Sequence, residues 1–249
     1  CIRDRDKLSN LEDFLRNLTK EVYVDKSTIN AFEYSILSKK AIELNENPVQ
    51  KMKAQKTDAE LEHLKDAFRK TDNAVSAIRN YIENNDKLSE FDIAVQLAKE
   101  FKKQGALGLS FNSIVAKDKN SALAHYSKSS KDEIITDGSL VLIDCGGYFE
   151  GGLATDITRV FVKGSPSELH KKVYTTVLKA FLQAFNYGKT NTQRPLTGFE
   201  IDQSVHNFFN SENLDGFVFN HGLGHGIGIN VHEYLSLIHI SEPTRLRRI

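Results

Sequence analysis

The feature that most constrains the fold is a pair of short apolar runs joined by a glycine-rich connection, SLVLIDCGGYFEGGLATDITRVFVKG, between Ser139 and Gly164. Short apolar runs bounded by turn residues are typical of buried strands. Val141 to Ile143 forms the first run and Val160 to Val162 the second. Glycines at 146, 147, 151 and 152 permit a tight or bulged connection between them. We therefore predict a hairpin-like pair of strands in a sheet.

Two aspartates flank this connection. Asp144 ends the first strand and Asp156 opens the second, so a hairpin brings both carboxylates toward one end of the sheet on the same face. Turns favour aspartate, so both residues can be ordinary turn residues. Two like charges held close together are instead costly unless a cation lies between them. Taken alone, the two aspartates leave both interpretations open.

Helices are predicted on both sides of the strand pair. Three of them begin with a capping box, in which Ser or Thr precedes an acidic residue by three positions and both side chains satisfy free amides. The boxes are Thr57 with Glu60, Ser89 with Asp92 and Thr197 with Glu200, and the helices run to about Asn84, Gly105 and Phe209. A further amphipathic helix is predicted from Ser167 to Asn186. Leu109 to Ala116 is predicted to be a strand, followed by a polar loop from Lys117 to Tyr126.

Apolar residues at helical spacing indicate the packed face of two of these helices, with the charged residues between them on solvated faces. These apolar residues are Phe91, Val95, Ala98 and Phe101 in one helix, and Leu169, Val173, Val177 and Phe181 in the other.

A histidine- and glycine-rich segment, FNHGLGHGIGINVHEY, spans Phe219 to Tyr234. Imidazole is the commonest nitrogen ligand for metals and carries protons near neutral pH, although any one histidine here can be an ordinary surface or core residue. Glycine weakens strands and adds nothing to a core, which favours a functional site. Together, Asp144, Asp156 and His225 suit two divalent ions about 3.5–4 Å apart that activate a bridging water.

Both ends of the chain are interpreted as foreign. Leu235 to Arg245 resembles the translation of a transposon-end adapter used in sequencing libraries, and Cys1 to Arg5 resembles the same adapter read from the other strand. The alternative is a natural basic tail. We therefore expect four segments: residues 1–5 and 235–249 as artefacts, 6–50 as the remnant of an N-terminal domain, and 51–234 as the domain that carries both aspartates and the histidine-rich segment. Residues 6–50 have too few apolar residues for a core of their own, with Glu21 to Phe32 as strand and turn.

The charge balance excludes proteins that bind nucleic acid or membrane surfaces through bulk charge, because Lys plus Arg and Asp plus Glu both number 33. Without the two end segments the chain is mildly acidic. Cys145 is then the sole cysteine, which we interpret as a small buried strand residue rather than a nucleophile. One cysteine forms no intrachain disulfide, which favours a cytoplasmic location. No apolar run approaches the roughly 20 residues that span a bilayer.

Three ordered stretches resemble the pita-bread metallopeptidase family, and most closely its Xaa-Pro aminopeptidases (aminopeptidase P). They are SFNSIVAKDKNSALAHY, IDCGGYFEGGLATDITRVF and HGLGHGIGINVHE. NPVQKMKAQKTDAELEH also resembles the start of the family's catalytic domain, so the resemblance covers about Asn47 to Tyr234. It implies an α+β fold with a curved, mainly antiparallel sheet and flanking helices, here truncated at its C-terminal end. It also implies a homodimer for the full-length protein.

The resemblance implies release of the N-terminal residue from Xaa-Pro peptides by metal-activated water. Two divalent ions are expected, Mn²⁺ first and Co²⁺ or Zn²⁺ as alternatives, held by Asp144, by Asp156 as a bridging ligand, and by His225. Alternatives within the fold are an Xaa-Pro dipeptidase or a creatinase-like hydrolase. A metal-free binding module is the alternative of another class, although such a module has no need of these three residues.

The family's histidines imply further roles. His125 and His232 are expected to hold the scissile peptide and its tetrahedral intermediate, and His221 to line the pocket for the residue after the cleaved bond. The sequence departs from the family's pattern in two ways. The connection between the two aspartates is one residue longer than in known family members, and the two glutamate ligands that the family supplies downstream are missing. Glu233 is not one of them. We therefore expect weak metal binding and little peptidase activity in this fragment, with an open sheet edge and exposed apolar surface.

Overall fold

The computed structural model describes residues 7–45, 47–190, 196–212, 214 and 216–233. The chain divides into two units between Met52 and Lys53, and the division into domains expected from the sequence stays a prediction. The end segments interpreted as foreign, residues 1–5 and 235–249, lie outside the described residues, as does Tyr234.

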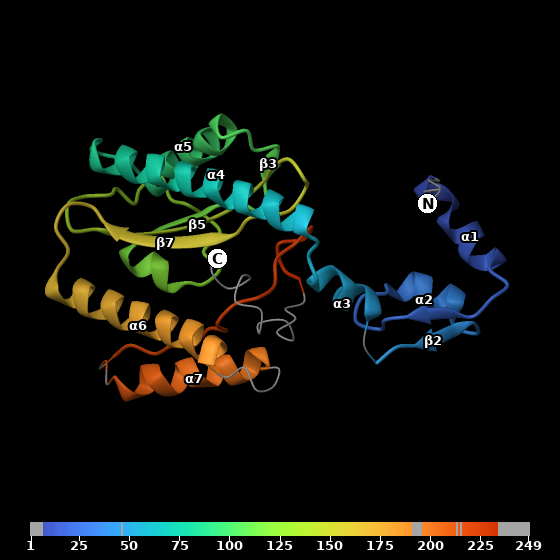
Figure 1. The fold of residues 1–249 in the computed structure, drawn as a ribbon. Coiled ribbons are helices and arrows are strands. Elements are labelled where there is room, and N and C mark those ends of the chain that lie inside the picture. Colours follow the sequence, from blue (N-terminus) through green and yellow to red (C-terminus); the bar gives the residue numbers. More distant parts are fainter. Residues whose placement is uncertain (1–6, 46, 191–195, 213, 215, 234–249) are drawn as a thin grey trace. The chain divides into compact units, whose positions relative to one another are not determined.

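The first unit consists of short helices and one pair of parallel strands (Figure 1). Its elements are η1 (Leu8–Asn10), α1 (Leu11–Asn17), β1 (Val22–Val24), α2 (Ala31–Leu37) and β2 (Ala41–Glu43). Leu15, Val24 and Leu37 are buried in a small cluster. The prediction that this segment has no core of its own is therefore wrong, because α1, β1 and α2 each turn one apolar side chain toward the others.

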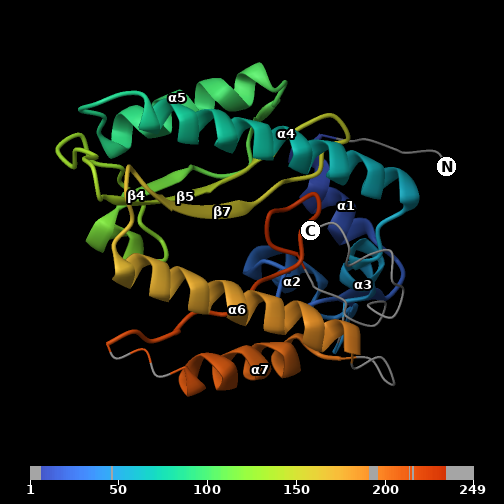
Figure 2. The same ribbon diagram turned by 60° about the vertical axis from the view of Figure 1, so that its left-hand side comes forward.

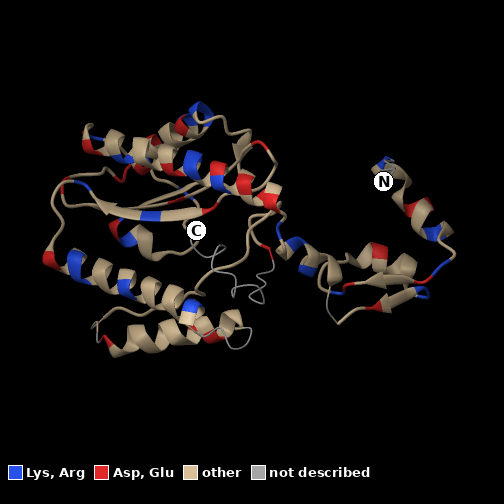
Figure 3. Ribbon diagram, viewed as in Figure 1, with Lys and Arg blue, Asp and Glu red and all other residues tan. Residues whose placement is uncertain are grey.

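The boundary between the two units falls within the short helix α3 (Pro48–Ala54). The second unit continues with two longer helices, α4 (Asp58–Glu83) and α5 (Glu90–Lys103). Both predicted capping boxes are present at the starts of α4 and α5, so these predictions are confirmed. Acidic and basic residues are interspersed along α4 (Figure 3). Several of them form ion pairs three or four residues apart, which adds modest local support to the helix.

The predicted strand pair lies in a three-stranded antiparallel sheet of order β4-β5-β7, formed by β4 (Ile114–Lys117), β5 (Leu140–Cys145) and β7 (Ile157–Val162). A separate antiparallel pair joins β3 (Gly108–Leu109) to β6 (Gly147–Tyr148). Figure 2 shows β4, β5 and β7 side by side. Helices and antiparallel strands occupy separate parts of this unit, which confirms the α+β prediction.

The prediction of one strand from Leu109 to Ala116 is wrong. The chain bends between Ser110 and Ser113, and its two halves pair with different strands. The Ser110 hydroxyl donates a hydrogen bond to the Thr155 carbonyl at 2.8 Å, which ties the bend to the glycine-rich connection. After β4, the predicted polar loop contains the short helix η2 (Asp118–Ala122).

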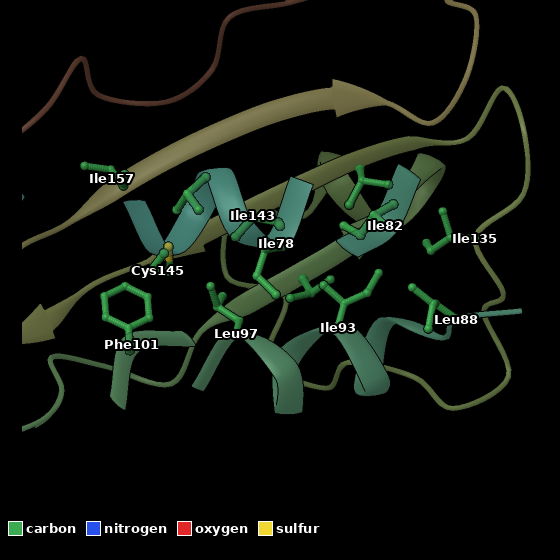
Figure 4. Close-up of a cluster of buried hydrophobic side chains, with 14 of the residues drawn as sticks. Ile78, Ile82, Leu88, Ile93, Leu97, Phe101, Ile135, Ile143, Cys145 and Ile157 are labelled. Carbon is green, nitrogen blue, oxygen red and sulfur yellow. The ribbon is translucent and has the colours of Figure 1, made fainter. Parts of the chain in front are cut away.

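The core lies between α4, α5 and the sheet (Figure 4). On α5 the buried apolar residues are Ile93, Leu97 and Phe101. The predicted face is therefore wrong for Phe91, Val95 and Ala98, which are exposed. Ile93, Leu97 and Phe101 follow one another at intervals of four residues and so lie on one side of the helix.

The last two helices, α6 (Glu168–Thr190) and α7 (Gly198–Ser211), pack against each other, and α7 begins with its predicted capping box. The buried positions of α6 are the small residues Thr176, Ala180 and Gly188. The expected apolar stripe is mostly exposed, with Leu169 at 54% and Phe181 at 57%. The predicted packed face of α6 is therefore wrong, because its buried positions are the small residues and not the large apolar ones. No helix in the described ranges is long and apolar enough to cross a bilayer.

Candidate metal centre

The sheet register places Asp144 and Asp156 on one face. Asp144 pairs with Thr158 across β5 and β7, and Asp156 lies two positions before Thr158. Side chains two positions apart in an extended strand point to the same face. The Thr158 hydroxyl donates a hydrogen bond to Asp144 Oδ1 at 2.9 Å, which fixes the carboxylate beside the partner strand.

The glycine-rich connection between the aspartates is closely packed. A β-carbon on Gly146 would lie 1.8 Å from the Thr155 carbonyl oxygen, so only glycine fits there. The Gly147 amide donates to Thr155 Oγ1 at 2.9 Å, and that hydroxyl lies 2.8 Å from the hydroxyl of Thr71 on α4. These contacts anchor the residue before Asp156 to the core.

The histidine-rich segment is attached to both α7 and the connection. The centroid of the Phe219 ring lies 4.6 Å from that of the His206 ring on α7. The Leu223 amide donates a hydrogen bond to Oδ1 of Asp202, also on α7, at 2.9 Å. Further along, the Ala154 amide donates to the Gly228 carbonyl at 2.7 Å. The last of these contacts brings the segment next to Asp156.

Residues far apart in the sequence converge at this place. His225 Nε2 lies 3.2 Å from Asp156 Oδ2, and the centroids of the His225 and His232 rings are 4.1 Å apart. One potential ligand atom from each of Asp156, His225 and His232 lies within 4.8 Å of the others. The predicted residue His232 thus lies among potential ligands, whereas the resemblance implies that it holds the peptide.

Asp144 is beside this group, and its environment disfavours a second negative charge. Burial raises the pKa of the Asp144 carboxyl, the hydrogen bond from Thr158 opposes that rise, and the neighbouring Asp156 carboxylate adds to it. The net pKa of Asp144 is raised. A cation between the two carboxylates would relieve their repulsion.

The donor set fits a divalent cation. His225 Nδ1 lies 3.0 Å from the Gly226 carbonyl, and in the tautomer that donates from this nitrogen Nε2 is unprotonated and can bind a metal. Metal-ligating histidines commonly bond a carbonyl through their other ring nitrogen in this way. Carboxylate oxygens with imidazole nitrogens suit Mn²⁺, Co²⁺ or Zn²⁺.

His125 and His221 lie close to each other, with ring centroids 6.4 Å apart. Both side chains are exposed, so a ligand can reach them. A depression of about 480 Å³ is lined by residues 123–128 around His125. Cys145 is fully buried and burial raises its pKa, in agreement with its interpretation as a core residue rather than a nucleophile.

Glu233 contributes to the site in a way that the sequence did not reveal. Its side chain, only 5% exposed, lies 2.6 Å from Lys53 Nζ and 3.6 Å from Lys56 Nζ, and it accepts from the Asn230 amide at 3.0 Å. Gly226 and Glu233 also form a β-bridge. Glu233 therefore fixes the segment that carries His225 to the start of this unit. No local pattern distinguishes it from a surface glutamate.

Replacing Glu233 with glutamine is expected to lower the free energy of unfolding by about 2 kcal/mol, because Lys53 and Lys56 lose their partner in a largely buried place. Burial raises the pKa of Glu233, but the hydrogen bonds from Lys53 and the Asn230 amide outweigh burial and lower the net pKa. Ionised Glu233 thus contributes stability above its unfolded pKa, which is lost as pH falls through the lowered folded pKa.

Denaturant titrations at pH 7 and under acid conditions measure this effect. The difference in free energy of unfolding between the unchanged protein and Glu233→Gln should have its full size at pH 7 and should shrink below about pH 4.5. The exposed Glu150 offers a matched control, and Glu150→Gln should match the unchanged protein. Equal stability of Glu233→Gln and the unchanged protein at pH 7 would contradict the role of this ion pair.

Comparison with known proteins gives a consistent result. The model of metallopeptidase family M24 matches residues 62–248. That range runs into residues 235–249, which lie outside the described part of the chain.

Named relatives and solved structures agree with the family match. An Xaa-Pro dipeptidase of Pyrococcus horikoshii is 31% identical over 92% of this chain and 64% of its own length. A probable Xaa-Pro aminopeptidase P of Ajellomyces capsulatus is 34% identical over 78% of this chain and 32% of its own length. The crystal structure of an X-Pro aminopeptidase from Thermotoga maritima superposes with a TM-score of 0.75 at 29% identity, over 95% of this chain and 66% of that one. The chain thus spans less than two thirds of the length of the curated relatives it matches.

Proposed function

The chain belongs to metallopeptidase family M24 and has its pita-bread fold, and from that premise we propose that the protein is an aminopeptidase that releases the N-terminal residue of Xaa-Pro peptides. The observation that carries this proposal is the approach of His225 Nε2 to Asp156 Oδ2 at 3.2 Å, with Asp144 on the same face of the sheet. A binding module without a metal would gain nothing from two adjacent carboxylates that repel each other.

In this proposal Asp144, Asp156 and His225 would hold two divalent ions, with Mn²⁺ as the preferred metal. When bound, such ions lower the pKa of a water molecule and polarise the peptide carbonyl. The chain's own residues orient the peptide. His125 and His232 hold the scissile bond and the oxygen that becomes negative, and His221 lines the pocket for the residue after that bond. The exposure of these three histidines supports such contacts.

Some relatives are named dipeptidases and others aminopeptidases. The two activities differ in the length of the peptide that they cleave, so substrate length is the property to test. We favour the aminopeptidase because a separate unit precedes the catalytic one. An Xaa-Pro dipeptidase or a creatinase-like hydrolase is the alternative. We further propose a cytoplasmic location, supported by the buried free thiol of Cys145, and a homodimer for the full-length protein.

We expect this 249-residue polypeptide to bind metal weakly and to hydrolyse peptides poorly. Glu233, the acidic residue next to His232, is engaged by Lys53 and is not part of the group of potential ligands. In the described part of the chain, that group contains one carboxylate and two imidazoles. Two ions of this kind need further carboxylate oxygens to fill their coordination.

A peptidase assay tests the proposal. The polypeptide and a version extended with the remainder of a full-length relative's catalytic domain would be assayed with Mn²⁺, an Xaa-Pro dipeptide and a longer Xaa-Pro peptide. We expect cleavage of the longer peptide by the extended protein and little by the polypeptide alone. Cleavage of the dipeptide alone would favour the dipeptidase. Metal-independent binding without cleavage by the extended protein would contradict the enzyme proposal.

A further inference from the structure

A buried carboxylate lies beneath the loop that carries His125. Glu90, in the first turn of α5, is 0% exposed, although its neighbour Phe91 is 40% exposed. A charged residue is almost never fully buried unless it is paired, yet Glu90 is buried here. Burying an ionised carboxylate is costly unless donors compensate it, so the donors around Glu90 show what it does.

All four side-chain hydrogen bonds of Glu90 come from one segment, residues 117–130. Oε1 accepts from the Lys117 amide at 2.7 Å and from Asn120 Nδ2 at 3.0 Å. Oε2 accepts from Tyr126 Oη at 2.6 Å and from the Ser130 amide at 2.8 Å. Burial and the bond to Glu90 raise the pKa of Tyr126 to about 12, which keeps its hydroxyl protonated as a donor.

In the sequence, His125 lies between Asn120 and Tyr126, the two residues whose side chains donate hydrogen bonds to Glu90. Other hydrogen bonds attach the ends of the segment, from the Leu140 amide to Asp118 and from the Phe91 amide to the Ser130 carbonyl. Between residues 119 and 128, the hydrogen bonds that leave the segment all end on Glu90, as far as the described chain shows. The centre of the loop is therefore oriented through one carboxylate.

Glutamine cannot replace Glu90 in this network. The glutamine side-chain NH₂ would take the place of one carboxylate oxygen and would itself be a hydrogen-bond donor. The loop donors that bind that oxygen would then face another donor and lose their acceptor. A smaller apolar residue would leave the backbone amides of Lys117 and Ser130 buried without acceptors. The network requires an acceptor with two free oxygens at this position.

We propose that Glu90 is a positioning residue that orients the 117–130 loop so that His125 faces His221. The inference rests on the function proposed above, because it is His125, and not Glu90, that would contact the peptide. Nothing in the local sequence marks Glu90 for this role.

The test compares Glu90→Gln with Glu100→Gln. Glu100 is also buried on α5, but its side-chain partners Gln96 and Lys103 lie on the same helix. Amide hydrogen exchange of residues 118–130 is expected to accelerate at least about tenfold in Glu90→Gln and by less than about twofold in Glu100→Gln. Unchanged exchange in Glu90→Gln, or equal acceleration in both variants, would overturn the proposal.

A spectroscopic signal separates orientation of His125 from general loosening. The ring resonance of His125, assigned by its loss in His125→Gln, should shift or broaden in Glu90→Gln while the resonances of His63 and His170 stay in place. Faster exchange of the loop with an unchanged His125 resonance, or equal changes in all histidines, would overturn the positioning role.

A milder variant keeps the test valid if Glu90→Gln does not fold. Tyr126→Phe removes one donor and leaves three, so it should give the same changes in residues 118–130 and His125 at a smaller amplitude, about threefold in exchange. Tyr126→Phe without either change would contradict the proposal. Neither measurement uses metal or peptide, so failure here bears on Glu90, whereas absence of metal binding bears on the proposed function.

Discussion

Asp156→Asn is expected to weaken further the binding of Mn²⁺ and Co²⁺ to this polypeptide and to leave the fold intact. Asp156 is the carboxylate that lies 3.2 Å from His225 Nε2, and asparagine keeps its shape but removes the anionic oxygen. We expect the dissociation constant to rise at least about 100-fold, which corresponds to about 2.7 kcal/mol. Calorimetric titration or the visible absorption of bound Co²⁺ measures this change.

The same substitution should not destabilise the protein in the absence of metal. Asparagine removes a negative charge beside Asp144, whose pKa is raised by burial and by the Asp156 charge. The thermal midpoint of Asp156→Asn without metal should therefore equal or exceed that of the unchanged protein. Asp66→Asn, on the exposed side of α4, is the matched control and should bind metal normally. Normal metal binding by Asp156→Asn would refute the assignment of Asp156.

Gly146→Ala should have the largest effect on stability, at more than about 3 kcal/mol. The added carbon would lie 1.8 Å from the Thr155 carbonyl oxygen and 2.4 Å from Ser110 Oγ. The carbonyl belongs to the backbone, so relief requires the connection to move away from β5, and Asp156 moves with it. We expect loss of cooperative unfolding or a marked fall in the denaturant midpoint, together with loss of metal binding.

Gly108→Ala is the matched control for this substitution. Gly108 lies in β3, and an added β-carbon there meets nothing within 4 Å. Its free energy of unfolding should change by less than about 1 kcal/mol. A Gly146→Ala protein as stable as Gly108→Ala would show that the connection between the aspartates is not packed as described.

Features determined by neighbouring residues could be predicted from the sequence. The capping boxes at Thr57, Ser89 and Thr197 depend on side chains three positions apart, and all three are present. The antiparallel pairing of β5 with β7 followed from two apolar runs around a glycine-rich connection. Because strand residues alternate between faces, this pairing also placed Asp144 and Asp156 on one side of the sheet.

Features determined by distant partners could not be predicted. The bend at Ser110 depends on the Thr155 carbonyl, a contact 45 positions away in the sequence. Burial of Glu90 depends on donors 27 to 40 positions away. A periodic pattern contains no information about such partners, so it did not indicate that Glu90 is buried.

The candidate site was predicted through its residue types rather than through its contacts. The histidine-rich segment and the two aspartates pointed to a metal centre, and the structure brings Asp156, His225 and His232 within 4.8 Å of one another. The ion pair between Glu233 and Lys53 was not foreseen, because it joins positions at opposite ends of the second unit. The separate roles of His125, His221 and His232 remain predictions.

The central claim is that Asp144, Asp156 and His225 converge to hold divalent metal. Anomalous diffraction from crystals of this polypeptide grown with Mn²⁺ tests that claim most directly. We expect an anomalous peak about 2.0–2.3 Å from both His225 Nε2 and an Asp156 carboxylate oxygen. Manganese bound elsewhere, with no peak between these two side chains, would contradict it.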